Sequence, residues 1–175
     1  MSLLLLLSLA QASETCADSF AESASYTLGS EALRLDRGVL TLGGLVLAKE
    51  VLELDVQGER AVFVMRNGPR RDLVVWDGAL RTLVQSESPA QVRLSDDGEQ
   101  VAYVNGVTSI TAVYVVPFVG GEPRQLTNVD LVRNPGKAPV GFVESPSQGL
   151  VFDGADLVWE GSSTTHRVRW TGGDR

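Results

Sequence analysis

The chain has 175 residues, of which 43% are hydrophobic and 21% charged, which suffices for one domain with an apolar core. Its 22 acidic and 15 basic residues give a net charge of −7, the wrong sign for a protein that binds nucleic-acid phosphates or an anionic membrane surface. A single histidine and a single cysteine exclude zinc fingers, internal disulfides and histidine-rich metal sites. We expect no metal and no cofactor.

The first twelve residues predict an export signal. The run from Leu3 to Ala10 is apolar, and a small-x-small cleavage pattern ends at Ala12, although no Lys or Arg precedes the run. The run is far too short to span a bilayer, and the alternative is a buried or frayed N-terminal segment. With cleavage, residues 13–175 form the mature domain, periplasmic or secreted. Cys16 lacks a small residue directly before it, so a lipid anchor is not expected.

From residue 25 onward the chain alternates between short strand-like runs and turn residues. Runs rich in Val, Leu, Tyr and Thr are broken by Gly, Asp and Asn at short intervals, and no long window carries a helical stripe. This pattern predicts an all-β fold.

Internal repetition indicates which all-β fold is present. Four turn glycines, Gly38, Gly78, Gly120 and Gly161, are spaced by 40, 42 and 41 residues, and each is flanked by strand-like runs. A second series of turns lies upstream of these, at residues 57–59, 95–99 and 145–149. We interpret each series as one turn repeated in successive units, the fourth unit being abbreviated.

The repeat defines four units within a single domain, at about residues 20–48, 49–88, 89–128 and 137–172. Four short strands in about 41 residues match one blade of a β-propeller. The units predict a β-propeller-like domain, either a closed four-bladed ring or a partial ring with open edges. A β-sandwich is the alternative without repeats.

The third unit resembles a known family. Residues 94–104, Leu-Ser-Asp-Asp-Gly-Glu-Gln-Val-Ala-Tyr-Val, resemble the Ser-Pro-Asp-Gly blade motif of TolB-type propellers, and residues 113–116 and 120–127 continue the likeness to a Gly-Gly turn and a closing Leu-Thr. Asp96 stands where the family usually has proline. The close match runs from Gln91 to Thr127 and implies a blade. Similar blades occur in propellers that cap prolyl-oligopeptidase-type hydrolases.

Candidate catalytic and metal-binding groups are few. His166 lies in a short polar strand, where we expect it to face solvent rather than act as a base. No Gly-x-Ser-x-Gly elbow or phosphate-binding glycine loop is present. The acidic turns around Asp97 and Asp153 lack the spacing of a calcium loop, so the carboxylates are expected to cap their own backbone. Trp76, Trp159 and Trp170 are expected to pack within or between blades.

The longest connection between units, residues 128–138, is the best candidate for a partner contact, since long loops on a rigid scaffold often bind. Its polar residues are Asp130, Arg133, Asn134 and Lys137. We therefore expect a non-enzymatic, exported protein- or peptide-binding module of the cell envelope. The alternatives are a self-associating fragment of a longer propeller, with a homodimer formed through open blade edges, and a small hydrolase or lyase that uses turn carboxylates.

Overall fold

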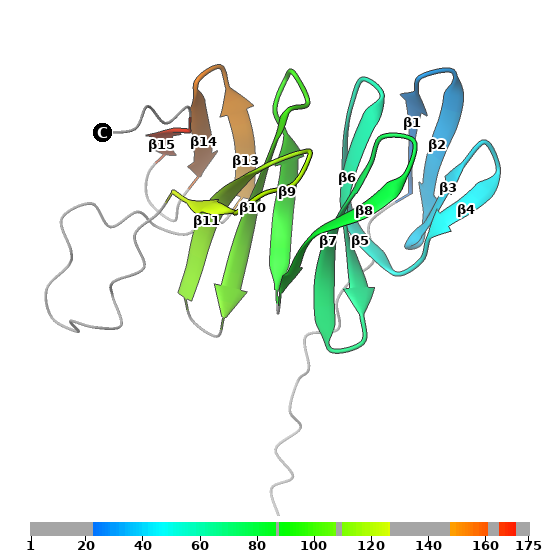
Figure 1. Ribbon diagram of the computed structural model, residues 1–175, viewed down its shortest axis with the longest axis horizontal. Coiled ribbons are helices and arrows are strands. Elements are labelled where there is room, and N and C mark those ends of the chain that lie inside the picture. The colour runs from blue at the N-terminus through cyan, green and yellow to red at the C-terminus, as the bar shows by residue number, and fades with distance from the viewer. Residues whose placement is uncertain (1–22, 87, 108–109, 127–147, 161–164, 171–175) are drawn as a thin grey trace, which may run out of the picture.

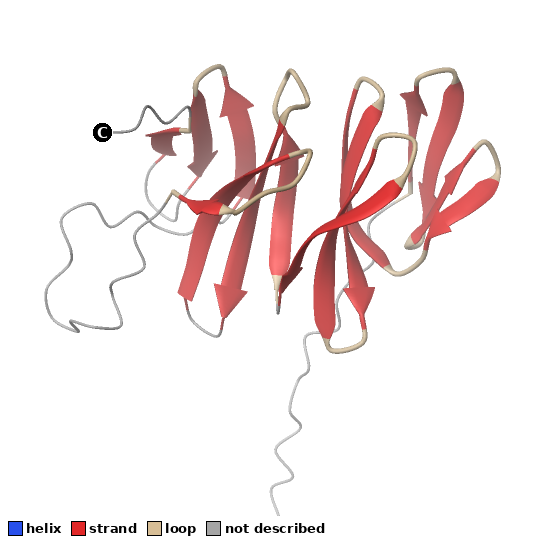
Figure 2. Ribbon diagram, in the orientation of Figure 1, coloured by secondary structure: helices blue, strands red, loops and turns tan. Residues whose placement is uncertain are grey.

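The computed structural model describes residues 23–86, 88–107, 110–126, 148–160 and 165–170. All regular structure in these residues is β-strand, as Figure 2 shows. No helix that could span a membrane is found in this part of the chain. The all-β prediction is confirmed.

The strands form four antiparallel sheets, in each of which consecutive strands are hydrogen-bonded neighbours. The first sheet contains β1 (Ala24–Leu28), β2 (Glu31–Asp36), β3 (Val39–Leu42) and β4 (Leu45–Ala48). The second contains β5 (Val51–Gln57), β6 (Arg60–Asn67), β7 (Arg70–Trp76) and β8 (Leu80–Ser86). The third contains β9 (Pro89–Leu94), β10 (Gln100–Val107), β11 (Ile110–Pro117) and β12 (Arg124–Gln125). The fourth contains β13 (Gln148–Asp153), β14 (Asp156–Glu160) and β15 (Thr165–Arg169).

The sheets stand side by side in chain order, with the first and fourth at opposite ends of the row (Figure 1). Each sheet is a meander of the kind that makes one propeller blade, so the predicted β-propeller-like architecture is confirmed. Four separate small sheets exclude the β-sandwich alternative, which requires two sheets packed face to face. In the described residues the row is open, as expected for a partial ring rather than a closed four-bladed one.

Three apolar cores lie between consecutive sheets. We call the face of a sheet that is turned toward the following sheet its forward face, and the opposite face its backward face. Each core joins the forward face of one sheet to the backward face of the next, through Leu33 and Phe63 between sheets one and two, Val62 and Tyr103 between sheets two and three, and Val113 and Trp159 between sheets three and four. The two middle sheets are therefore apolar on both faces.

The turn glycines are only partly equivalent. Gly78 and Gly120 both follow the third strand of their sheets, with φ of 101° and 100°, which a side chain would strain. Gly38 instead follows the second strand of the first sheet, and the turn after the third strand lies at Gly43 and Gly44. The predicted equivalence was wrong for Gly38, and Gly161 lies outside the described residues.

The fourth sheet corrects a second expectation. The predicted turn at residues 145–149 overlaps β13, which already begins at Gln148. Residues 145–147 of that turn lie outside the described residues, and the acidic turn predicted around Asp153 is found between β13 and β14, where Gly154 has a φ of 58°. A bulge lies between Gln148 and Val151, at the start of the strand.

Candidate functional site

A cleft of about 370 Å³ opens where the inner strands β1, β5 and β9 converge. Because each strand belongs to a different sheet, the cleft exists only when three successive units are assembled. Its walls combine polar and apolar side chains: Ser23, Ala24, Tyr26, Leu35, Leu52, Glu53, Leu54 and Arg93.

Two acidic side chains of β5 fix the second sheet to the third beside this cleft. Glu53 Oε2 accepts a hydrogen bond from the backbone N–H of Val92 at 3.2 Å. Asp55 Oδ2 accepts one from the N–H of Leu94 at 2.7 Å. The two carboxylates thus accept hydrogen bonds from backbone N–H groups on the edge of β9 that has no neighbouring strand within its sheet.

Arg93 brings a positive charge to the same cleft. Its Nη1 donates to the backbone carbonyl of Val92 at 2.6 Å, which holds the side chain near the strand edge. A guanidinium carries five N–H donors in a fork that matches a carboxylate. With Glu53 in the same lining, the cleft presents both signs of charge beside the half-exposed ring of Tyr26 and three leucines. Such a lining suits an extended peptide with mixed side chains.

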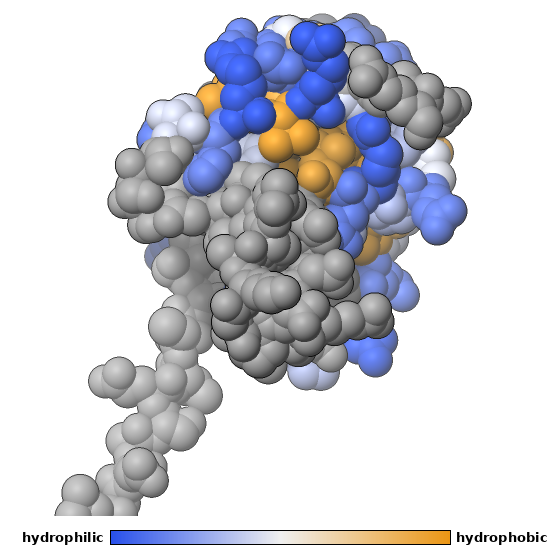
Figure 3. All heavy atoms as spheres, turned by 90° about the vertical axis from the view of Figure 1, so that its left-hand side faces the viewer, coloured by the Kyte–Doolittle hydropathy of each residue, from blue (hydrophilic) through white to orange (hydrophobic). Residues whose placement is uncertain are grey.

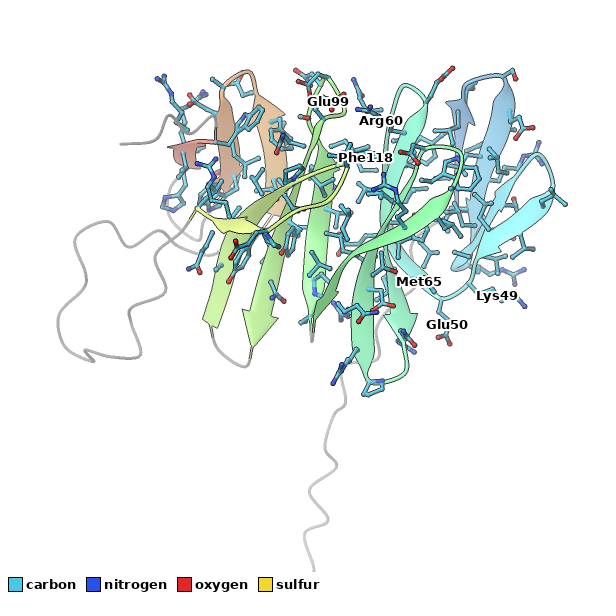
Figure 4. The ribbon with its side chains drawn as sticks, in the orientation of Figure 1. Lys49, Glu50, Arg60, Met65, Glu99 and Phe118 are labelled. Carbon is cyan, nitrogen blue, oxygen red and sulfur yellow. The ribbon has the colours of Figure 1, made fainter. Side chains whose placement is uncertain are left out.

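At the junction of sheets two and three, an aromatic ring of the core packs against two arginines. Phe118 is fully buried, and the guanidinium carbons of Arg60 and Arg81 lie 4.9 and 5.7 Å from its ring centroid. Arg60 also donates to Glu99 Oε1 at 2.6 Å, and Arg81 donates to the carbonyl of Val119 at 3.0 Å. Figure 4 shows Arg60, Glu99 and Phe118 gathered at this junction. These arginines therefore have a structural role.

The turn that carries the blade motif is held by its own side chains. The buried Ser95 donates from Oγ to Asp97 Oδ1 at 2.6 Å and accepts from the N–H of Gln100 at 2.9 Å. Asp97 Oδ1 also accepts from the N–H of Glu99 at 2.9 Å. The Ser95 hydroxyl and the Glu99 N–H hold the pKa of the Asp97 carboxyl below its usual range. The predicted capping role of Asp97 is confirmed.

An arginine pairs with both carboxylates of the second acidic turn. Arg167 donates from Nη1 to Asp156 at 3.0 Å and from Nη2 to Asp153 at 2.7 Å. These two hydrogen bonds, the one to Asp156 first, raise the pKa of Arg167. Among the described residues no group of three potential metal-ligating side chains occurs.

His166 and the tryptophans lie at the third core. His166 is half-buried, and its ring lies 5.6 Å from that of Trp159, so the expectation that it faces solvent was wrong. The cause is strand alternation, since His166 pairs with Trp159 across β14 and β15 and shares its inward face. Trp159 is buried, Trp170 packs edge-on against Phe152, and Trp76 packs against the first core, which confirms the predicted packing roles.

The predicted partner loop lies outside the described residues, as do Asp130, Arg133, Asn134, Lys137 and the predicted signal at residues 1–12. The sequence reasoning also missed the cleft. A usable signal was present in β5, where Glu53 and Asp55 alternate with leucines, because charges at alternating positions of an otherwise apolar strand indicate a face that meets polar groups.

The sequence matches no protein-family model, and no characterised protein of similar sequence was found. Solved structures with similar folds include the β-propeller domain of the Trilobed protease from Pyrococcus furiosus, described as having an open velcro topology, at 10% identity and a TM-score of 0.45. Another is TolB from Acinetobacter baumannii, at 16% identity and a TM-score of 0.42. They cover 85% and 87% of this chain, which spans 57% and 40% of theirs.

Proposed function

We propose that this chain is a non-enzymatic module that binds a protein partner, and that an extended segment of the partner lies in the cleft between β1, β5 and β9. The observation that carries the proposal is the lining of that cleft, in which Arg93 and Glu53 stand beside Tyr26 and apolar leucine side chains. A peptide offers carboxylates, amines and apolar side chains in close succession, and this lining complements each of them.

A non-enzymatic role is supported by how the carboxylates are used. Asp97 caps a turn, Asp153 and Asp156 bind Arg167, and Glu53 and Asp55 bind the backbone of β9. Each therefore makes a structural contact. A hydrolytic activity that disappears in His166→Ala or Asp97→Asn would contradict this part of the proposal.

A location in the cell envelope is part of the same proposal and is supported by the apolar run and cleavage pattern of residues 1–12. Fractionation of cells that express the full chain, with mass spectrometry of the mature N-terminus, tests it. Cleavage after Ala12 is the expected result, and an intact N-terminus in the cytoplasm would contradict it.

The binding test uses a displayed library of random peptides, selected on the folded chain. We expect enrichment of peptides that contain an acidic residue next to apolar ones, with affinity reduced about tenfold or more by Arg93→Ala. Arg70→Ala is the matched control, because Arg70 is an exposed arginine at the start of β7, outside the cleft. If the enriched peptides bind Arg93→Ala as tightly as the original chain, the proposed site is wrong.

A further inference from the structure

The two end sheets of the row each leave one face without a neighbouring sheet in the described part of the molecule. Between sheets, packing follows one rule, in which a forward face meets a backward face. The exposed faces are the backward face of β1–β4 and the forward face of β13–β15. They are thus the two kinds of face that pack together inside the molecule.

The forward face of the fourth sheet has an apolar centre and a charged border. Val151 and Val158 pair across β13 and β14, and Val151 is 51% exposed. Strand register places these side chains on the face with Asp153, Asp156, Glu160, Arg167 and Arg169. Figure 3 views the molecule from this end and shows hydrophobic surface between hydrophilic side chains. An apolar patch with a polar border is typical of an interaction surface.

The backward face of the first sheet is hollowed. A depression of about 670 Å³ is lined by Arg34, Asp36, Arg37, Val39 and Thr41. Val46 pairs with Thr41 across β3 and β4 and is 56% exposed, so apolar surface borders the hollow. The exposed valine pair of the fourth sheet has a counterpart here in Val39 and Val46, so both faces carry apolar side chains.

Charge also favours pairing of these two faces over pairing of either with itself. Arginines outnumber carboxylates on the described part of the first sheet's backward face, with Arg34 and Arg37 against Asp36. Carboxylates outnumber arginines on the fourth sheet's forward face, where Asp153, Asp156 and Glu160 stand against Arg167 and Arg169. Opposite net charges attract and set the register of docking, whereas like faces repel.

We propose that the forward face of β13–β15 docks on the backward face of β1–β4 of a second copy of this chain, so that copies associate head to tail. The contact is heterologous, and it closes into a ring if the rotation between copies permits and otherwise extends as a chain. Because charged side chains border both faces, association is reversible and weakens as salt screens the charges.

The experiment measures mass by light scattering on the purified full chain across a wide concentration range, at low and high salt. The chain mass is 18.7 kDa. We expect a dimer or larger species that dissociates on dilution and at high salt. Val151→Lys disrupts the docking face of the fourth sheet, and Arg34→Glu disrupts that of the first sheet. Each variant alone is expected to be monomeric. Val119→Lys is the control, because Val119 is exposed on a turn of the third sheet, away from both faces.

Mixing the two variants gives the decisive result. The Arg34→Glu chain retains an intact fourth-sheet face and the Val151→Lys chain an intact first-sheet face, so the mixture is expected to form a one-to-one dimer that neither forms alone. A wild-type chain that stays monomeric at every concentration would overturn the proposal. So would a dimer that one of the two substitutions leaves intact, since that result indicates like faces pairing. Circular dichroism of each variant checks that a lower molar mass in solution reflects lost association and not unfolding.

Discussion

Asp55 reaches across the gap between two sheets to bind the backbone N–H of Leu94, 39 residues further along the chain. Glu53 makes the corresponding contact with Val92, also 39 residues away. Gln57 donates to the carbonyl of Asp96 over the same separation, at 2.9 Å. Contacts between adjacent sheets therefore recur at nearly the length of one repeat, and they link residues that occupy similar places in successive units.

The Asp55 contact predicts a local loss of protection. In Asp55→Ala the N–H of Leu94 loses a charge-assisted acceptor at a partly buried strand edge, which should cost about 1–3 kcal/mol of unfolding free energy. Compared with the original chain, Asp55→Ala should show a larger increase in amide hydrogen exchange at Leu94 than at the buried amides of β6. Asp36→Ala is the control, because Asp36 is an exposed aspartate of the first sheet. Equal protection of Leu94 in the original chain and in Asp55→Ala would contradict the assigned role.

Glycine substitutions can separate backbone strain from a steric clash. Gly58 and Gly98 have φ of 60° and 69°, so alanine strains the backbone at both positions. A Cβ at Gly58 would meet open space, whereas a Cβ at Gly98 would lie 3.2 Å from Cδ of Arg60. Each alanine variant should lose about 1 kcal/mol through strain, and Gly98→Ala should lose more because Arg60 must shift. Urea denaturation gives both values, and equal losses would argue against a close approach of Arg60.

The buried ring of Phe118 should be a large single contributor to the junction of sheets two and three. Phe118→Ala leaves a cavity and removes the ring from both arginines, with an expected loss of about 3–5 kcal/mol. Phe118→Leu keeps most of the apolar volume and should lose less. Thermal unfolding of both variants measures the difference, and a near-neutral Phe118→Ala would show that the ring is not part of the core.

The Asp97 turn predicts a dependence of stability on pH. Because the folded-state pKa of Asp97 is lowered, its ionised form stabilises the fold above the unfolded-state pKa, and this contribution is lost as the pH falls through the folded value. Asp97→Asn should therefore be less stable than the original chain at neutral pH, and the difference should shrink in acid. Unfolding free energies measured from neutral to acid pH check this. The control is Asp96→Asn in the same turn, and a difference that stays constant with pH would contradict the role of the charge.

The repeat and the strand pattern in the sequence were sufficient to predict the class of fold. Alternating apolar runs and turn glycines depend on local backbone physics, so the meanders of sheets two and three could be predicted from them. The placement of Gly38 could not, because glycine occupies every turn of the first two sheets, so a regular spacing alone does not say which turn a given glycine forms. His166 was misjudged because its polarity suggested solvent, whereas its register against Trp159 turns it inward.

The candidate site could not be predicted from the sequence, for a different reason. Tyr26, Glu53 and Arg93 come from three sheets, and only the packing of these sheets against one another brings them to one cleft. Strand pairing within a unit is a local property. The way in which units pack against one another is a long-range property, and it cannot be predicted from the sequence of a single unit.

The separation of the apolar interior into three cores has a consequence for how the molecule comes apart. Each described core is shared by two adjacent sheets, so stability is a sum over contacts between neighbouring sheets rather than the property of one central core. The end sheets have one described core each and the middle sheets have two. Under mild denaturant, fraying should begin at β1–β4 or β13–β15 while β5 to β11 remain ordered, so the molecule melts inward like a short stack rather than in a single step.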